Sequence, residues 1–114
     1  IHIVMDILNA HEKNQLDFGI GFYDKEDVPQ FHCSTEAAGR QIEINDGIAN
    51  VTLTIPKWPL IQGSFYLNAY IRDGSKTLDH VIEAVWINCE KGDFYNTGIL
   101  PSWDKGFYCD YEWQ

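Results

Sequence analysis

Four side chains alternate along one short segment and have the chemistry of a sugar-binding surface. Within residues 63–72, apolar and polar positions alternate, which predicts a β-strand with one face toward a core. Because strand side chains point alternately to two faces, the polar set must share the other face. Tyrosine rings can cover the apolar C–H side of a pyranose, while amide and guanidinium groups can bind hydroxyls or a sugar carboxylate. This stripe consists of Tyr66, Asn68, Tyr70 and Arg72.

The segment after the stripe is expected to fold back beside it. Asp73-Gly74-Ser75 is a turn sequence and predicts a hairpin. Such a hairpin sets Tyr70 near His80. It also sets Tyr66 near Ala84.

Two more rows of side chains are expected on the same face. Residues 17–23 alternate in the same way, and their non-core positions include two glycines, Gly19 and Gly21. Two glycines there predict a shallow floor that a ligand can approach. Gln30, His32 and Ser34 form a third polar row. The candidate ligand-binding residues are therefore Tyr66, Asn68, Tyr70, Arg72, His80, Trp86, Tyr23 and His32.

Each of these residues also has a purely structural explanation. Tyrosine is common on exposed antiparallel faces because it packs well against cross-strand neighbours. The alternative function is therefore a protein interaction or dimerisation module whose aromatic face contacts protein.

Catalytic and metal-binding motifs do not occur in the sequence. It contains no phosphate-binding loop, nucleophile elbow, zinc-protease motif or dinucleotide fingerprint. None of the four histidines, His2, His11, His32 and His80, lies two or four positions from another. The acidic run at residues 24–27 predicts a solvated turn and lacks the calcium-loop pattern. We expect neither an enzyme nor a metal or other cofactor.

The net charge bears on possible partners, and the cysteine content bears on the redox compartment. The formal net charge of −9 repels phosphate backbones and anionic lipid surfaces, so nucleic-acid binding is not expected. Cys33, Cys89 and Cys109 make an odd number without a close pair, which favours buried or half-buried free thiols and a reducing compartment. Asn50-Val51-Thr52 matches a glycosylation sequon but falls within an expected strand, so we interpret it as a chance match.

The start of the chain has neither the basic residues nor the cleavage site of a signal peptide. No apolar run approaches the roughly 18 residues of a membrane-spanning helix. Because the chain opens inside an alternating apolar segment without Met, we expect a fragment of a longer protein.

Period-two alternation dominates the whole chain and predicts an all-β fold. About seven to eight short antiparallel strands separated by turn residues are typical of a single-domain β-sandwich covering residues 1–114. We expect a loop at 90–105, followed by a last strand at about 107–113. The strands are expected at about 1–8, 16–23, 29–35, 42–44, 49–55, 65–72, 78–87 and 107–113. The predicted core includes Phe18, Ile20, Phe22, Val51, Leu53, Phe65, Leu67 and Ile71.

Five segments, taken in order and spacing, resemble the C-terminal domain of the Wzt family, the nucleotide-binding subunit of ABC transporters that export O-antigen polysaccharide. The resemblance runs over nearly the whole chain. Its segments are Phe18-Gly19-Ile20-Gly21-Phe22-Tyr23-Asp24, Trp58-Pro59-Leu60-Ile61-Gln62-Gly63-Ser64-Phe65-Tyr66-Leu67, Leu78-Asp79-His80, Asp93-Phe94-Tyr95-Asn96-Thr97-Gly98 and Glu112-Trp113.

The resemblance implies an immunoglobulin-like or jelly-roll β-sandwich of about seven to eight short strands, in the cytoplasm at the inner membrane. It implies recognition of the modified non-reducing end of O-antigen, which couples chain termination to export. It further implies a homodimer and, through the full-length protein, a transporter membrane subunit as partner. The family's ATPase domain and its strand upstream of residue 1 have no counterpart within residues 1–114, and we expect both to belong to the longer protein. Because the binding face varies with the sugar, the site residues above rest on strand alternation alone.

Overall fold

The computed structural model describes residues 1–9, 14–44, 47–74 and 76–114. Every regular element in these ranges is a β-strand, which confirms the predicted all-β class. The predicted Ile42–Ile44 strand is present, whereas His11 lies outside the described residues. The strands are β1 (His2–Asn9), β2 (Asn14–Asp24), β3 (Pro29–Ser34), β4 (Ile42–Ile44), β5 (Gly47–Thr54), β6 (Gly63–Asp73) and β7 (Lys76–Cys89).

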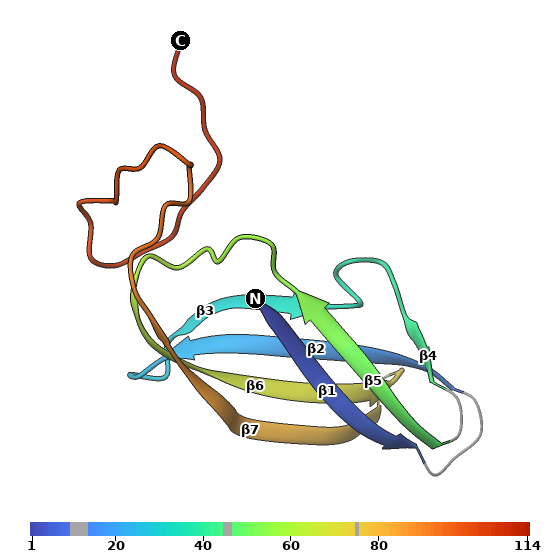
Figure 1. Cartoon of the computed structure of the whole chain (residues 1–114). Helices are drawn as coiled ribbons and strands as arrows, with labels where there is room; N and C mark the ends of the chain where they lie inside the picture. The colour runs from blue at the N-terminus through green and yellow to red at the C-terminus, as the bar shows by residue number, and fades with distance from the viewer. Residues whose placement is uncertain (10–13, 45–46, 75) are drawn as a thin grey trace.

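These strands form two antiparallel sheets arranged as a sandwich. The larger sheet has the order β3-β2-β6-β7, with β4 paired to the beginning of β2. The smaller sheet consists of β1 and β5, which lie diagonally across one face of the larger sheet (Figure 1). No strand of the described chain covers the opposite face of the larger sheet, which we call the outer face.

The core lies between the sheets, where the apolar positions of β2 and β6 meet those of β1 and β5. Phe22 is 1% exposed, and Val51 of β5 packs against Phe18. Leucines from both sheets, Leu53 and Leu67, pack together with Phe22. Phe18, Ile20, Phe22, Val51, Phe65 and Leu67 are buried as predicted, while Leu53 and Ile71 are half-buried at the edge of this core.

The hairpin between β6 and β7 forms as predicted, although Ser75 of its turn lies outside the described residues. Tyr70 stands opposite His80, which is the expected pairing. The register then shifts between Leu67 and Ala69, where β7 contains extra residues.

This bulge makes one predicted pairing wrong. Tyr66 faces Trp86, two positions beyond the expected Ala84. The cause is a left-handed residue in the bulge, Glu83, with a φ of 52°. A bulge of this kind adds residues to one strand of a ladder and displaces every later pair.

The predicted strand at 107–113 is wrong. Phe107 forms only an isolated bridge with Leu60, and the rest of the segment has no strand partner. Tyr108 holds the segment instead, because its hydroxyl donates to the carbonyl of Gly92 at 2.9 Å. The C-terminal region lies beyond one end of the sandwich (Figure 1). The radius of gyration is consequently 16.5 Å, against about 13 Å for a compact domain of this length.

Candidate ligand-binding face

All eight candidate residues lie on the outer face. The pairing of β2 with β6 puts Tyr23 beside Tyr66, and the pairing with β3 puts His32 beside Gly21. The pairing of β6 with β7 adds His80 and Trp86. The structure therefore brings together residues from four strands that are up to 63 positions apart in the sequence, from Tyr23 to Trp86.

One row of aromatic rings crosses three neighbouring strands. The rings of Tyr23 and Tyr66 stack at 5.2 Å between centroids, and Tyr66 lies 5.1 Å from Trp86. Tyr66 is only 6% exposed, so the expectation that its ring lies exposed on this face is wrong. Its two neighbours cover it, although it points away from the core. Trp86 at the end of the row is 50% exposed.

The hydroxyl of Tyr66 is held by an acid that sequence alternation did not indicate. It donates to Oδ1 of Asp27 at 2.7 Å. This hydrogen bond, followed by desolvation and the charge of Asp27, raises the pKa of Tyr66 to about 12. Asp27 lies in the turn after β2 with a φ of 66°, a conformation that Asp adopts more readily than most residues. The row is thereby fixed at both the ring and the hydroxyl.

A second group of side chains surrounds Tyr70. Its ring lies directly on Gly19, where a Cβ atom would overlap it. His32 stacks on one side at 5.8 Å and 18°, and the guanidinium carbon of Arg72 lies 4.5 Å from the Tyr70 ring centroid. Among the described residues, none accepts a hydrogen bond from the guanidinium of Arg72, so its N–H groups are available to a ligand.

The predicted shallow floor over the glycines is therefore wrong. Tyr70 covers Gly19, and Tyr23 approaches the position of a Cβ on Gly21 to 3.1 Å. The glycines let tyrosine rings lie flat on the sheet, and the resulting surface is a platform of ring faces.

Asn68 has a structural role that limits its use as a ligand contact. Its side-chain oxygen accepts a hydrogen bond from the N–H of Glu83 at 2.8 Å and so closes the β7 bulge. Its amide N–H₂ has no partner among the described residues and remains a possible donor. His80 is exposed beside Tyr70.

The carboxylates of Asp24 and Asp27, in the acidic turn after β2, accept hydrogen bonds from other groups of the chain. Oδ1 of Asp24 accepts from the backbone N–H groups of Glu26 and Val28, both at 2.9 Å, which confirms the predicted turn. The carboxylate of Asp27 accepts the hydrogen bond from the Tyr66 hydroxyl described above. In the described part of the chain, no three His, Cys, Asp or Glu side chains gather in a metal-binding arrangement.

The cysteines are free thiols, as predicted. Cys33 and Cys89 are half-buried, and burial raises the pKa of the Cys33 thiol. Cys109 is exposed, so its predicted burial is wrong. It lies in the C-terminal segment that does not form the expected strand.

No protein-family model matches this chain, and no curated protein matches it. Among the residues described, no helix is long and apolar enough to cross a membrane.

Proposed function

We propose that this domain is a non-catalytic polysaccharide-binding module and that its outer face is the binding platform. The observation that carries the proposal is the row Tyr23–Tyr66–Trp86, whose middle member is buried and anchored while Trp86 remains half-exposed. A fixed aromatic surface loses little conformational entropy when it binds, and it can stack on the apolar side of a sugar ring.

Polar donors lie beside this row and can give orientation. Arg72 and His80 flank Tyr70, and the Asn68 amide lies between the two aromatic groups. Guanidinium and imidazole groups bind hydroxyls and anionic sugar substituents. The identity of the polysaccharide rests on the resemblance to Wzt domains. On that basis, the ligand is the modified non-reducing end of O-antigen, read in the cytoplasm by a homodimer that belongs to a transporter subunit.

A protein interaction or dimerisation module is the second candidate, and β7 favours it. This 14-residue strand forms the edge of the larger sheet, and its apolar side chains are exposed on both faces. An open strand edge with exposed apolar residues is a site for pairing with another chain. The exposed apolar residues of β7 are Leu78, Val81, Ile82, Val85 and Trp86.

Titration with capped and uncapped O-polysaccharide separates the two candidates. Calorimetry should detect binding of the capped form, and Trp86→Ala should weaken it by about 1–3 kcal/mol, as for other aromatic hot spots. The matched control is Trp103→Ala, which removes a 73% exposed indole from the C-terminal loop. Unchanged affinity in folded Trp86→Ala would remove the outer face as the site. Absence of any sugar binding, together with a dimer in sedimentation, would favour the interaction module.

A further inference from the structure

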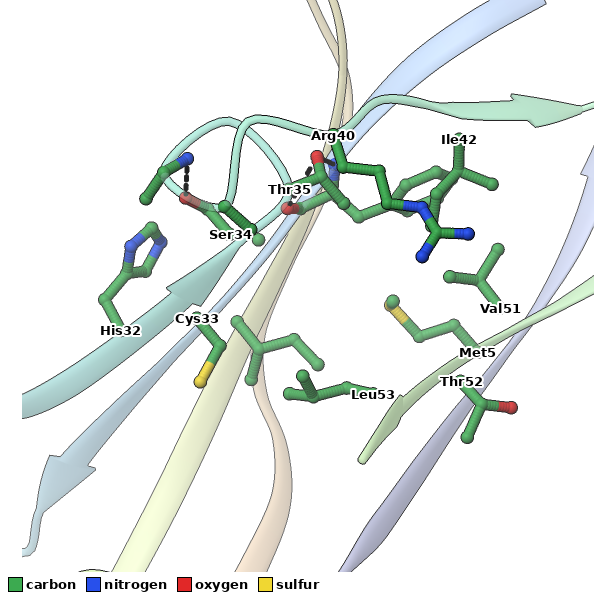
Figure 2. A pocket seen from close by; sticks show the side chains of 15 residues that line it. Met5, His32, Cys33, Ser34, Thr35, Arg40, Ile42, Val51, Thr52 and Leu53 are labelled. Carbon is green, nitrogen blue, oxygen red and sulfur yellow. Dashed lines mark hydrogen bonds between the residues drawn. The ribbon is translucent and has the colours of Figure 1, made fainter. Parts of the chain in front are cut away.

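A recess opens between the two sheets, on the side of β2 opposite the outer face. The end of β3 and the loop after it form one wall, and β5 forms the other. Its volume of about 450 Å³ lies within the roughly 300–1,000 Å³ of small-molecule sites. Figure 2 shows its side chains converging from both walls. The apolar lining includes Met5, Phe18, Ile20, Ile42, Val51 and Leu53.

The recess has few polar groups to offer a ligand. The hydroxyl of Ser34 accepts a hydrogen bond from the N–H of Ala37 at 3.0 Å. The hydroxyl of Thr35 donates to Asp17 at 2.9 Å. Both hydroxyls thus have a hydrogen-bond partner, and the lining adds only His32 and Thr52 as further uncharged polar side chains, so a sugar with many hydroxyls would lose more bonds to water than the recess replaces. An apolar ligand would have no such penalty.

One positively charged side chain lies at the opening of this apolar recess. Arg40 extends from the loop over the recess, near Ile42 and Val51 (Figure 2). No described residue forms a hydrogen bond or ion pair with its guanidinium. The carboxylate of Asp17 is bound to the same loop in another way, because it accepts hydrogen bonds from the Thr35 hydroxyl at 2.9 Å and from the Gln41 amide at 3.1 Å. An external anion therefore has an unoccupied partner here, in a chain whose net charge of −9 otherwise disfavours anions.

The loop that presents Arg40 is held by its own backbone. The N–H of Arg40 donates to the carbonyl of Thr35 at 2.8 Å, and that of Ala38 donates to Ser34 at 3.1 Å. Gly39 has a φ of 69°, which glycine adopts without strain. This bonding fixes the loop before any ligand arrives, which reduces the entropy lost on binding.

We propose that the recess binds a single apolar chain that ends in an anionic head group, with the chain between the sheets and the head group on Arg40. At roughly 30 Å³ for each water-sized group, the space accommodates on the order of ten chain carbons. Carboxylate and phosphate both fit the planar guanidinium donors. The proposal does not rest on sugar binding by the outer face, although Gly19 and His32 line the recess and also contact Tyr70 of the platform.

Cys33 lines the recess, so the rate at which its thiol is labelled can show whether a ligand occupies the recess (Figure 2). In a Cys89→Ser/Cys109→Ser background it is the only thiol. The rate at which a thiol reagent labels it is measured with increasing decanoate, decyl phosphate and decanol, each below its micelle concentration. We expect saturable protection by both anions, and weaker protection by decanol. A tighter fit of decyl phosphate identifies a phosphate head group as the preferred source, and a tighter fit of decanoate identifies a carboxylate; either order supports the site.

Two variants test the parts of the site separately. Arg40→Gln should weaken protection by the anions at least tenfold and leave decanol unchanged, whereas Lys76→Gln, a charge loss far along the chain, should change neither. Ala38→Trp, an exposed position on the loop, should fill the recess and abolish protection by all three. Circular dichroism checks that each variant is folded. The proposal is overturned if no compound protects Cys33 saturably, or if Arg40→Gln leaves the affinity for anions unchanged.

Discussion

Gly19 offers the most direct test of how the aromatic platform is built. A Cβ at this position would overlap the Tyr70 ring, so Gly19→Ala must move that ring off the sheet. The backbone itself tolerates alanine, because Gly19 lies within β2 and is not among the residues with positive φ. Any loss of stability should therefore come from Tyr70 and its neighbours.

The expected cost follows from the contacts of Tyr70. Displacing the ring loses its stacking on His32, about 0.5–1.5 kcal/mol, and its cation–π contact with Arg72, about 0.5–1 kcal/mol. A strained rotamer adds about 0.5–1.5 kcal/mol. Replacing glycine in a strand returns about 0.5–1 kcal/mol of backbone entropy. The net expectation is a loss of about 0.5–3.5 kcal/mol in the free energy of unfolding.

A double-mutant cycle tests this reasoning by urea unfolding. With Tyr70→Ala in place, Gly19→Ala has no ring to displace and should stabilise the domain by about 0.5–1 kcal/mol. Gly21→Ala is the matched control, because its Cβ would approach Tyr23 to 3.1 Å and needs only a small shift. We expect it to change stability by less than about 0.5 kcal/mol. Equal effects of Gly19→Ala with and without Tyr70 would refute the glycine–tyrosine contact.

Three further predictions concern the core, the buried tyrosine and the bulge. Phe22→Ala should lower the free energy of unfolding by about 3–5 kcal/mol, measured by urea titration, because this 1% exposed ring fills the centre of the core; a cost below about 1 kcal/mol would contradict the packing. Tyr66 has a folded-state pKa of about 12, above the ordinary value of 10, so its contribution to stability is complete below pH 10 and is lost as the pH rises toward 12. Tyr66→Phe should show a smaller loss over that window in thermal melts, and an identical pH profile would count against the hydrogen bond to Asp27. Asn68→Ala removes the acceptor of the Glu83 N–H, so stability should fall by about 1 kcal/mol and hydrogen exchange at that amide should accelerate; unchanged exchange would rule out this role for Asn68.

The sequence by itself determined the strands and which of their faces is buried. Along residues 18–22 and 65–71, apolar side chains recur at every second position, and burial of that face excludes a register shifted by one residue. The core of Phe18, Phe22 and Leu67 was predictable for this reason. The same alternation placed the candidate residues together on the outer face.

Only the tertiary structure decided what covers each outward-facing residue. Alternation assigns Tyr66 to a face, but its burial depends on rings from β2 and β7 and on a carboxylate 39 positions away. The β7 bulge depends on the left-handed conformation of Glu83 and its bond to Asn68, neither of which has a periodic signal.

The same distinction explains the C-terminal segment and the recess. Residues 107–113 have a strand-like composition, but a strand needs a neighbouring edge to satisfy its backbone groups, and the described chain gives this segment only the bridge at Leu60. The recess below Arg40 exists because β3 and β5, separated in the sequence, form facing walls. Local sequence specifies the conformation and polarity of each strand, whereas pairing, coverage and cavities depend on contacts between distant segments.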